Sequence, residues 1–178
     1  MSSALDPVTR WALAAADGDP VAQAAFVRHT QAEVWRLAAA LVDPGAADDL
    51  VQETYLRAFR GLSSFEARST ARTWLFGIAR RTCADHLRTV TRRRRLESLL
   101  TVQPKRDAAP DPADSVAAAD LLDRLPPERR SALVLTQVLG LSYEEAAAVE
   151  GVPVGTIRSR VARARSTLIE ALADELAS

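Results

Sequence analysis

The amino-acid sequence predicts an all-α protein of two small helical domains joined by a flexible acidic linker. The 178 residues include 34 Ala and 22 Arg, which are both strong helix formers. Apolar residues recur every three or four positions in several segments, as they do on one face of an α-helix. The stretch from Thr101 to Ser115, TVQPKRDAAPDPADS, contains three prolines and no large apolar residue after Val102, so we expect it to stay unpacked.

These observations predict four parts of the chain. Residues 1–19 form an N-terminal leader, residues 20–95 the first domain, residues 96–115 the linker and residues 116–178 the second domain. Each domain is small enough that only a compact helical unit would bury sufficient surface.

The first domain contains three predicted helices. The first spans Pro20 to about Val42 and is broken by Asp43-Pro44-Gly45. The second, ADDLVQETYLRAFRGL, is followed by a loop around Phe65 to Thr70, and the third runs from about Ala71 into Arg92–Arg95.

The second and third helices show separate apolar and polar faces. The apolar face of the second comprises Val51, Tyr55, Ala58, Phe59 and Leu62. In the third helix, Arg81 and Asp85 are spaced to form an i,i+4 ion pair.

The second domain begins with a predicted helix from Val116 to Leu125, which stops at Pro126-Pro127. A second helix ends near Leu139, with Gly140 in the position of a C-terminal cap. Ser142 to Glu145 then forms an S-x-x-E capping box that opens a short helix to about Val149.

A turn over Glu150-Gly151-Val152 leads to a last helix that Pro153 begins. Two helices joined by a short glycine turn, the second rich in arginine, are typical of a helix-turn-helix DNA reader. We expect Arg158 and Arg165 to contact phosphates. The side chains expected to face the bases are Thr156, Ser159, Arg160 and Arg163. The alternative is a solvated arginine-rich helix.

The net formal charge is zero, but the charges are segregated. Residues 1–64 carry −3, 65–95 carry +7, 96–157 carry −5 and 158–178 carry +1. The third helix is therefore basic enough to bind phosphates, although such runs are also found as solvated tails. Beside these arginines, Phe65 and Trp74 either stack on unpaired bases or belong to the core.

The sequence contains no catalytic constellation. The two histidines lie in different helices, Cys83 has no evident base, and no glycine-rich phosphate loop is present. We therefore expect no enzymatic activity, no cofactor and no metal. No apolar run is long enough to span a membrane and no signal peptide is evident, so we expect a cytoplasmic protein.

Three segments together resemble a known family. ADDLVQETYLRAF is similar to region 2.2, SFEARSTARTWLFGIARRTCADHLR to regions 2.3 and 2.4, and LSYEEAAAVEGVPVGTIRSRVARAR to region 4.2 of bacterial RNA polymerase sigma factors of the extracytoplasmic-function group. The second domain is most similar to the sigma-C branch. The resemblance implies a region 2 helical bundle and a region 4 helix-turn-helix that bind core RNA polymerase and promoter DNA.

The resemblance also implies roles for individual residues. The residues that would dock on the clamp helices of the β′ subunit are Asp48, Asp49, Gln52 and Glu53, a face that otherwise reads as a solvated flank. The loop from Phe65 to Thr73 would capture a flipped base of the −10 element. Its −10 contacts would be Phe65, Arg68, Ser69, Arg72, Thr73 and Trp74, with Arg80, Arg81 and Arg88 along the DNA backbone. Most relatives carry Asn where Arg81 stands. The last helix would read the −35 element while region 4 contacts the β flap.

Three further hypotheses remain open. The alternative function is a helix-turn-helix regulator whose first domain senses a signal or dimerises. The resemblance also allows an anti-sigma factor as a partner. The third hypothesis is that the acidic middle of the chain covers the basic third helix when polymerase is absent, so that the free protein binds promoter DNA poorly.

Overall fold

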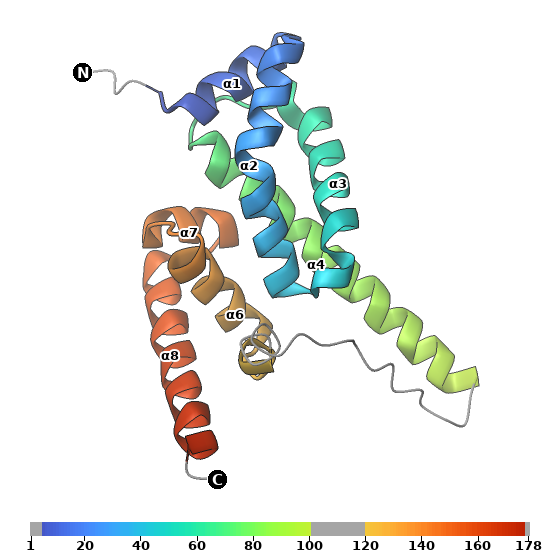
Figure 1. Ribbon diagram of the computed structural model, residues 1–178, viewed down its shortest axis with the longest axis vertical. Coiled ribbons are helices and arrows are strands. Elements are labelled where there is room, and N and C mark those ends of the chain that lie inside the picture. The colour runs from blue at the N-terminus through green and yellow to red at the C-terminus, as the bar shows by residue number, and fades with distance from the viewer. Residues whose placement is uncertain (1–4, 101–119, 177–178) are drawn as a thin grey trace.

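The computed structural model describes residues 5–100 and 120–176, and every regular element within these ranges is helical (Figure 1). The first domain contains α1 (Pro7–Ala16), α2 (Pro20–Leu41), α3 (Pro44–Gly61) and α4 (Ala71–Leu100), with a 3₁₀ turn at Leu62–Ser64. The predicted all-α fold is confirmed.

The first three helices begin in the same way. Asp6, Asp19 and Asp43 each cap a helix by accepting hydrogen bonds from backbone N–H groups, and a proline follows each of them. A carboxylate satisfies N–H groups that have no partner within the helix, and proline at the first position already has a helical φ. The same Asp-Pro pair that separates α2 from α3 therefore starts α3.

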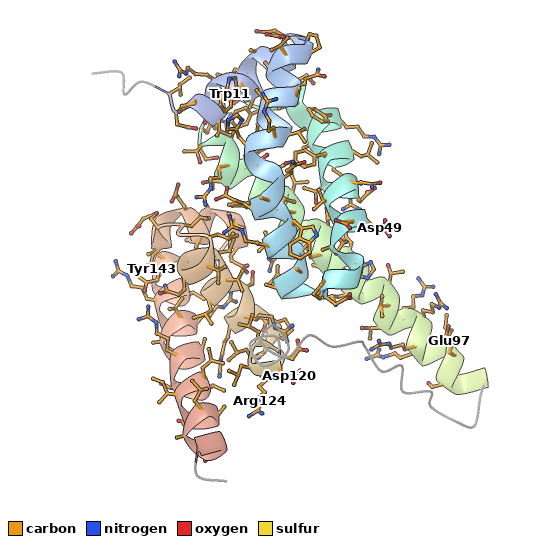
Figure 2. All side chains as sticks on the ribbon, viewed as in Figure 1. Trp11, Asp49, Glu97, Asp120, Arg124 and Tyr143 are labelled. Atoms are coloured by element: carbon orange, nitrogen blue, oxygen red, sulfur yellow. The ribbon has the colours of Figure 1, made fainter. Side chains whose placement is uncertain are left out.

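Helix α1 lies within residues that the sequence pattern assigned to a leader. It packs on α2, where the ring of Trp11 lies 4.2 Å from that of His29 (Figure 2 labels Trp11). Thr9 is buried, and its Oγ1 accepts a hydrogen bond of 2.9 Å from the backbone N–H of Ala71. Helix α1 therefore helps to fix the start of α4.

The buried face of α3 differs from the predicted one. Phe59 is 36% exposed, whereas Leu50 and Thr54 are buried. The hydroxyl of Thr54 donates to the carbonyl of Leu50 at 2.6 Å, so this polar residue is buried without an unsatisfied group. The apolar pattern left out Thr54 because a threonine that satisfies its own hydroxyl gives no apolar signal in the sequence.

The second domain contains α6 (Pro127–Leu133), a π-helical turn at Val134–Val138, α7 (Tyr143–Glu150) and α8 (Val154–Leu176). Both arms of the predicted Ser142 capping box are present, at 3.1 and 2.9 Å. Gly140 and Gly151 have φ of +69° and +68°, as helix ends of this kind require.

Two predicted features fall partly outside the described ranges. Residues 120–123 are helical, but the expected start of that helix at 116–119 is not described. The described part of the expected linker, residues 96–100, is a continuation of α4, and the remainder is not described.

The two domains are in contact. Helix α7 packs against α4, while α6 and the π turn approach α2 (Figure 1). The distal half of α4 projects past the end of α3, away from the helices of the second domain.

Candidate nucleic-acid interface

The loop before α4 forms one wall of a hollow of about 340 Å³. The residues around it are Ser64, Phe65, Glu66, Arg68, Ser69 and Trp74. Trp74 is half-buried and its ring lies 5.0 Å from that of Phe65, which is only 8% exposed. Trp74 is therefore available to stack on a base, while the 8% exposure of Phe65 favours the alternative that its ring belongs to the core.

Two further residues of the loop have different surroundings. The side chain of Arg68 is 85% exposed and pairs with Glu66, and Ser69 is also exposed. Thr73, in contrast, is buried, and its backbone N–H donates to Thr70 Oγ1 at 3.1 Å. In this conformation Thr73 closes the first turn of α4, and its contact with DNA stays a prediction.

Arg72 is held from both domains. Its guanidinium donates two hydrogen bonds of 2.8 Å to Glu33 of α2 and one to the carbonyl of Leu139 in the second domain. These bonds with Glu33 raise the pKa of Arg72. The guanidinium also lies 5.1 Å from the centre of the Phe76 ring. Arg72 thus links α2 to the second domain in this structure, and its contact with −10 DNA stays a prediction.

Arg80 is held by Glu150, the last residue of α7. Its guanidinium donates to the two carboxylate oxygens at 3.1 and 3.0 Å. The side chain of Glu150 is fully buried, and it also accepts a hydrogen bond from Ser131. Arg160 of α8 donates to the same carboxylate at 3.4 Å. The carboxylate of Glu150 therefore binds one arginine from each of the two predicted DNA surfaces.

Arg81 and Arg88 are exposed on α4, but the predicted pair of Arg81 with Asp85 is wrong. Asp85 accepts instead from Arg57 of α3 at 2.7 Å and from Arg88. The hydrogen bonds from Arg57 and Arg88 lower the pKa of the Asp85 carboxyl. Helix periodicity identified a possible partner, but α3 supplied a closer one.

The helix-turn-helix places Ile157, Val161 and Ala164 of α8 in the core. Arg158, Ser159 and Arg163 are exposed on its other side, as expected. Thr156 is half-buried, Arg160 faces Glu150, and Arg165 donates to Gln137. Contact of Arg160 with DNA stays a prediction, and it would require Arg160 to leave Glu150.

The predicted polymerase-binding face lies on α3. Asp48, Asp49 and Gln52 are exposed and Glu53 is half-buried, with a 2.7 Å ion pair to Arg57. Figure 2 places Asp49 on the side of α3 away from the second domain. Trp35 of α2, which the sequence analysis did not select, borders this face and donates its indole N–H to Asp48 at 3.0 Å.

Comparison with known families and proteins gives matches to both domains. Residues 26–94 match the family model of sigma-70 region 2, and residues 115–168 match that of sigma-70 region 4. The chain is 50% identical to the ECF RNA polymerase sigma factor SigC of Mycobacterium tuberculosis over 92% of this chain and 90% of that protein. It is 32% identical to the ECF RNA polymerase sigma-E factor of Escherichia coli over 85% of this chain and 86% of the relative.

Solved structures show the same fold. The sigma factor RpoE in complex with the anti-sigma factor NepR from Bartonella quintana matches with a TM-score of 0.71 and 32% identity, over 82% of this chain and 93% of that one. CnrH in complex with the cytosolic domain of CnrY matches with a TM-score of 0.74 and 29% identity, over 96% of this chain and 99% of that one. No helix within the described ranges is long and apolar enough to cross a membrane.

Proposed function

Because this chain belongs to the extracytoplasmic-function sigma factors of the sigma-70 family, and so binds core RNA polymerase and promoter DNA in transcription initiation, we propose which of its surfaces carries each task. Such a factor is a non-enzymatic polymerase subunit. We place its work in the cytoplasm, where polymerase and promoter DNA meet.

The polymerase contact is assigned to the outer face of α3. Asp48, Asp49 and Gln52 are exposed on α3. Figure 2 places Asp49 on the side away from the second domain. The β′ clamp helices would bind this face, and the β flap would bind region 4. This separation leaves α4 and α8 available for DNA in the complex.

The −10 element is assigned to the hollow beside Trp74. A half-buried aromatic ring next to exposed Arg68 and Ser69 suits an unstacked base and its phosphate. Flipping a base costs a few kcal/mol of unstacking, which binding of the single strand would offset. The −35 element is assigned to the exposed residues Arg158, Ser159 and Arg163 of α8.

We assign to the free chain a closed state, in which the two domains contact each other and DNA binding is suppressed. Arg80 and Arg160, one from each predicted DNA surface, share the carboxylate of Glu150, and Arg72 is bound to Glu33 and Leu139. The buried carboxylate of Glu150 thus binds two arginines that would otherwise be available to DNA phosphates. Polymerase would have to separate the domains before both surfaces engage DNA.

An anti-sigma factor is assigned as a further partner class. The support comes from relatives, since RpoE and CnrH were each solved with such a protein or with a cytosolic domain bound. Co-purification from the native host would identify a partner of this kind.

The α3 assignment is tested by measuring how tightly the purified chain binds core polymerase, with analytical ultracentrifugation as the method. The unsubstituted chain should bind, and Asp49→Lys should bind at least tenfold more weakly. Glu170→Lys, an exposed site on α8 with the same change of charge, is the matched control. Equal binding by both variants would reject the α3 face.

A further inference from the structure

Helix α1 contacts both ends of the loop at residues 65–70, which we call the −10 loop. It packs against the 3₁₀ turn at Leu62–Ser64, where the loop begins, and against α4, where the loop ends. The functions above give α1 no role, and the segment that matches sigma-70 region 2 begins only at residue 26. A part of the chain outside that segment therefore supports the elements around the hollow.

The link from α1 to α4 is made by one side chain. Thr9 is buried, and its hydroxyl donates to Asp6 Oδ2 at 2.5 Å and accepts from the backbone N–H of Ala71 at 2.9 Å. A hydroxyl has a single proton to donate, and an ionised carboxylate can only accept. Because Asp6 accepts that proton, the oxygen of Thr9 is left to accept from Ala71. The carboxylate therefore fixes the direction of the Thr9 hydroxyl.

The N–H of Ala71 depends on this acceptor. Ala71 is the first residue of α4 and is fully buried, so neither its own helix nor water can accept from its N–H. Thr70, the residue before the helix, uses its hydroxyl oxygen to accept from the N–H of Thr73 at 3.1 Å. Thr9 thus supplies a helix cap from a distant part of the chain.

The turn that Thr9 caps carries the aromatic ring of the hollow. Trp74 lies three residues after Ala71, and its N–H donates to the carbonyl of Thr70 at 3.0 Å. Arg68 and Ser69 of the −10 loop line the same hollow. A shift of the first turn of α4 would therefore move the Trp74 ring relative to Arg68 and Ser69.

The −10 loop adopts a conformation that requires fixed ends. Ala67 has a φ of +52°, in the left-handed region that disfavours residues with a Cβ. A residue stays in that region only when the surrounding structure holds it there. The 8% exposure of Phe65 shows that the start of the loop is held in the core, and the bond from Ala71 to Thr9 holds the helix that follows its end.

We propose that Thr9 is a positioning residue for the −10 element, whose hydroxyl holds the first turn of α4 so that Trp74 meets a flipped base without rearrangement. The proposal rests on the assignment of that base to the hollow beside Trp74. A site that is already ordered binds more tightly, because less conformational freedom is lost on binding.

Two substitutions remove the link in different ways. Thr9→Val keeps the shape of the side chain but leaves the N–H of Ala71 without an acceptor. Asp6→Asn keeps an oxygen for the backbone of α1 but places a donor where Oδ2 accepts the Thr9 proton. Thr9→Ser keeps the hydroxyl and is the rescue variant. Thr82→Val is the matched control, because Thr82 is buried in α4 and its hydroxyl donates to the carbonyl of Ile78 in the same helix.

The measurement separates contacts with bases from contacts with phosphates. Each full-length protein is titrated, by fluorescence anisotropy, against a random-sequence single strand of roughly 12 nucleotides and against an abasic strand of the same length, which keeps the phosphates. The ratio of the two affinities measures the binding that depends on bases. Trp74→Ala should lower this ratio at least about fivefold, because stacking of a base on the ring is lost. Thermal unfolding identifies the variants that fold.

Thr9→Val and Asp6→Asn should each lower the ratio roughly three- to tenfold, as expected for the loss of one hydrogen bond. Thr9→Ser and Thr82→Val should change it less than twofold, and the affinity for the abasic strand should stay within twofold in every variant. A merely structural role of Thr9 would weaken binding of both strands alike, and this result would overturn the proposal.

An unchanged ratio in folded Thr9→Val would also overturn it, and folded Asp6→Asn decides in the same way if the valine variant does not fold. If Trp74→Ala lowers the ratio while these two variants do not, the −10 assignment stands and the role of Thr9 is rejected. If Trp74→Ala leaves the ratio unchanged, the assignment of the hollow fails, and the role of Thr9 fails with it.

Discussion

Arg80 of α4 and Glu150 of α7 form two hydrogen bonds, at 3.1 and 3.0 Å, between residues 70 positions apart in the sequence. Among the described residues, no acid of α4 pairs with Arg80 and no base of α7 pairs with Glu150. The pair joins region 2 to region 4 and removes Arg80 from the surface that the −10 DNA would use. Its disruption is therefore the direct way to examine the closed state.

Replacement of Glu150 by Gln should increase DNA binding by the free chain. The substitution removes the charge that holds Arg80 and Arg160 but leaves an oxygen to accept from Ser131. Hydrogen bonds to charged groups contribute about 1.5–3 kcal/mol, so a −10 single strand should bind about tenfold more tightly. Anisotropy titration measures this, and Glu144→Gln on the exposed side of α7 is the control. An unchanged affinity in a folded Glu150→Gln protein would argue against closure.

Replacement of Trp35 by Phe should weaken binding to core polymerase. The indole N–H holds Asp48 at 3.0 Å, and a phenyl ring keeps the bulk but loses this donor. A hydrogen bond of about 0.5–1 kcal/mol corresponds to a two- to fivefold loss of affinity. Competition for core polymerase against a labelled chain measures it. Trp11→Phe, on α1, is the control and should leave the affinity for core polymerase unchanged. Equal losses of affinity in the two variants would exclude a specific role for Trp35.

Replacement of Asp85 by Asn should cause a loss of stability that depends on pH. Hydrogen bonds from Arg57 and Arg88 lower the pKa of this carboxyl in the folded state. The contribution of the Asp85 carboxylate to the free energy of unfolding is therefore fully present above its pKa in the unfolded chain, about 3.9. It is lost as the pH falls through the lowered pKa of the folded state. Because the side chain is 41% exposed, solvent screening limits the contribution to roughly 0.5 kcal/mol.

Urea unfolding at pH 7 and at pH 2 measures this difference. The unsubstituted chain should exceed Asp85→Asn in stability at pH 7 and match it at the lower pH. A difference that stays constant between the two pH values would show that the ion pair is not its source.

Cys83 should be unreactive in the folded protein. It is buried in α4, and burial raises the pKa of its thiol to about 12. Because the thiolate is the reacting form, iodoacetamide at pH 8 should modify it at least a hundredfold more slowly in buffer than in urea. Mass spectrometry measures the rate, and rapid labelling of the folded chain would contradict the buried position.

The sequence predicted most elements of the fold because their signals are local. Asp43-Pro44, the Ser142 capping box and Gly151 each specify a helix end within a few residues. Helix α1 was missed although Asp6-Pro7 carries the same signal, because its ten residues are too few to show a repeated apolar pattern. The π turn after α6 has no evident sequence signal.

The site was predicted less completely because its contacts are long-range. Arg72, Arg80 and Arg160 were expected to contact DNA, but Glu33 and Glu150, which bind them in this structure, lie in other helices. Residue spacing along one helix holds no information about such partners. Trp35 was missed for the same reason, since Asp48 is on the neighbouring helix.

Run-off transcription on a pool of genomic promoter fragments tests the central claim, that this chain directs core RNA polymerase to promoters. Core polymerase is assayed alone, with the chain, and with a housekeeping sigma factor as a control for core activity. We predict discrete transcripts with the chain that differ from those of the control factor and are absent with core alone. No discrete transcript with the chain, while the control factor initiates normally on the same core, would contradict the claim.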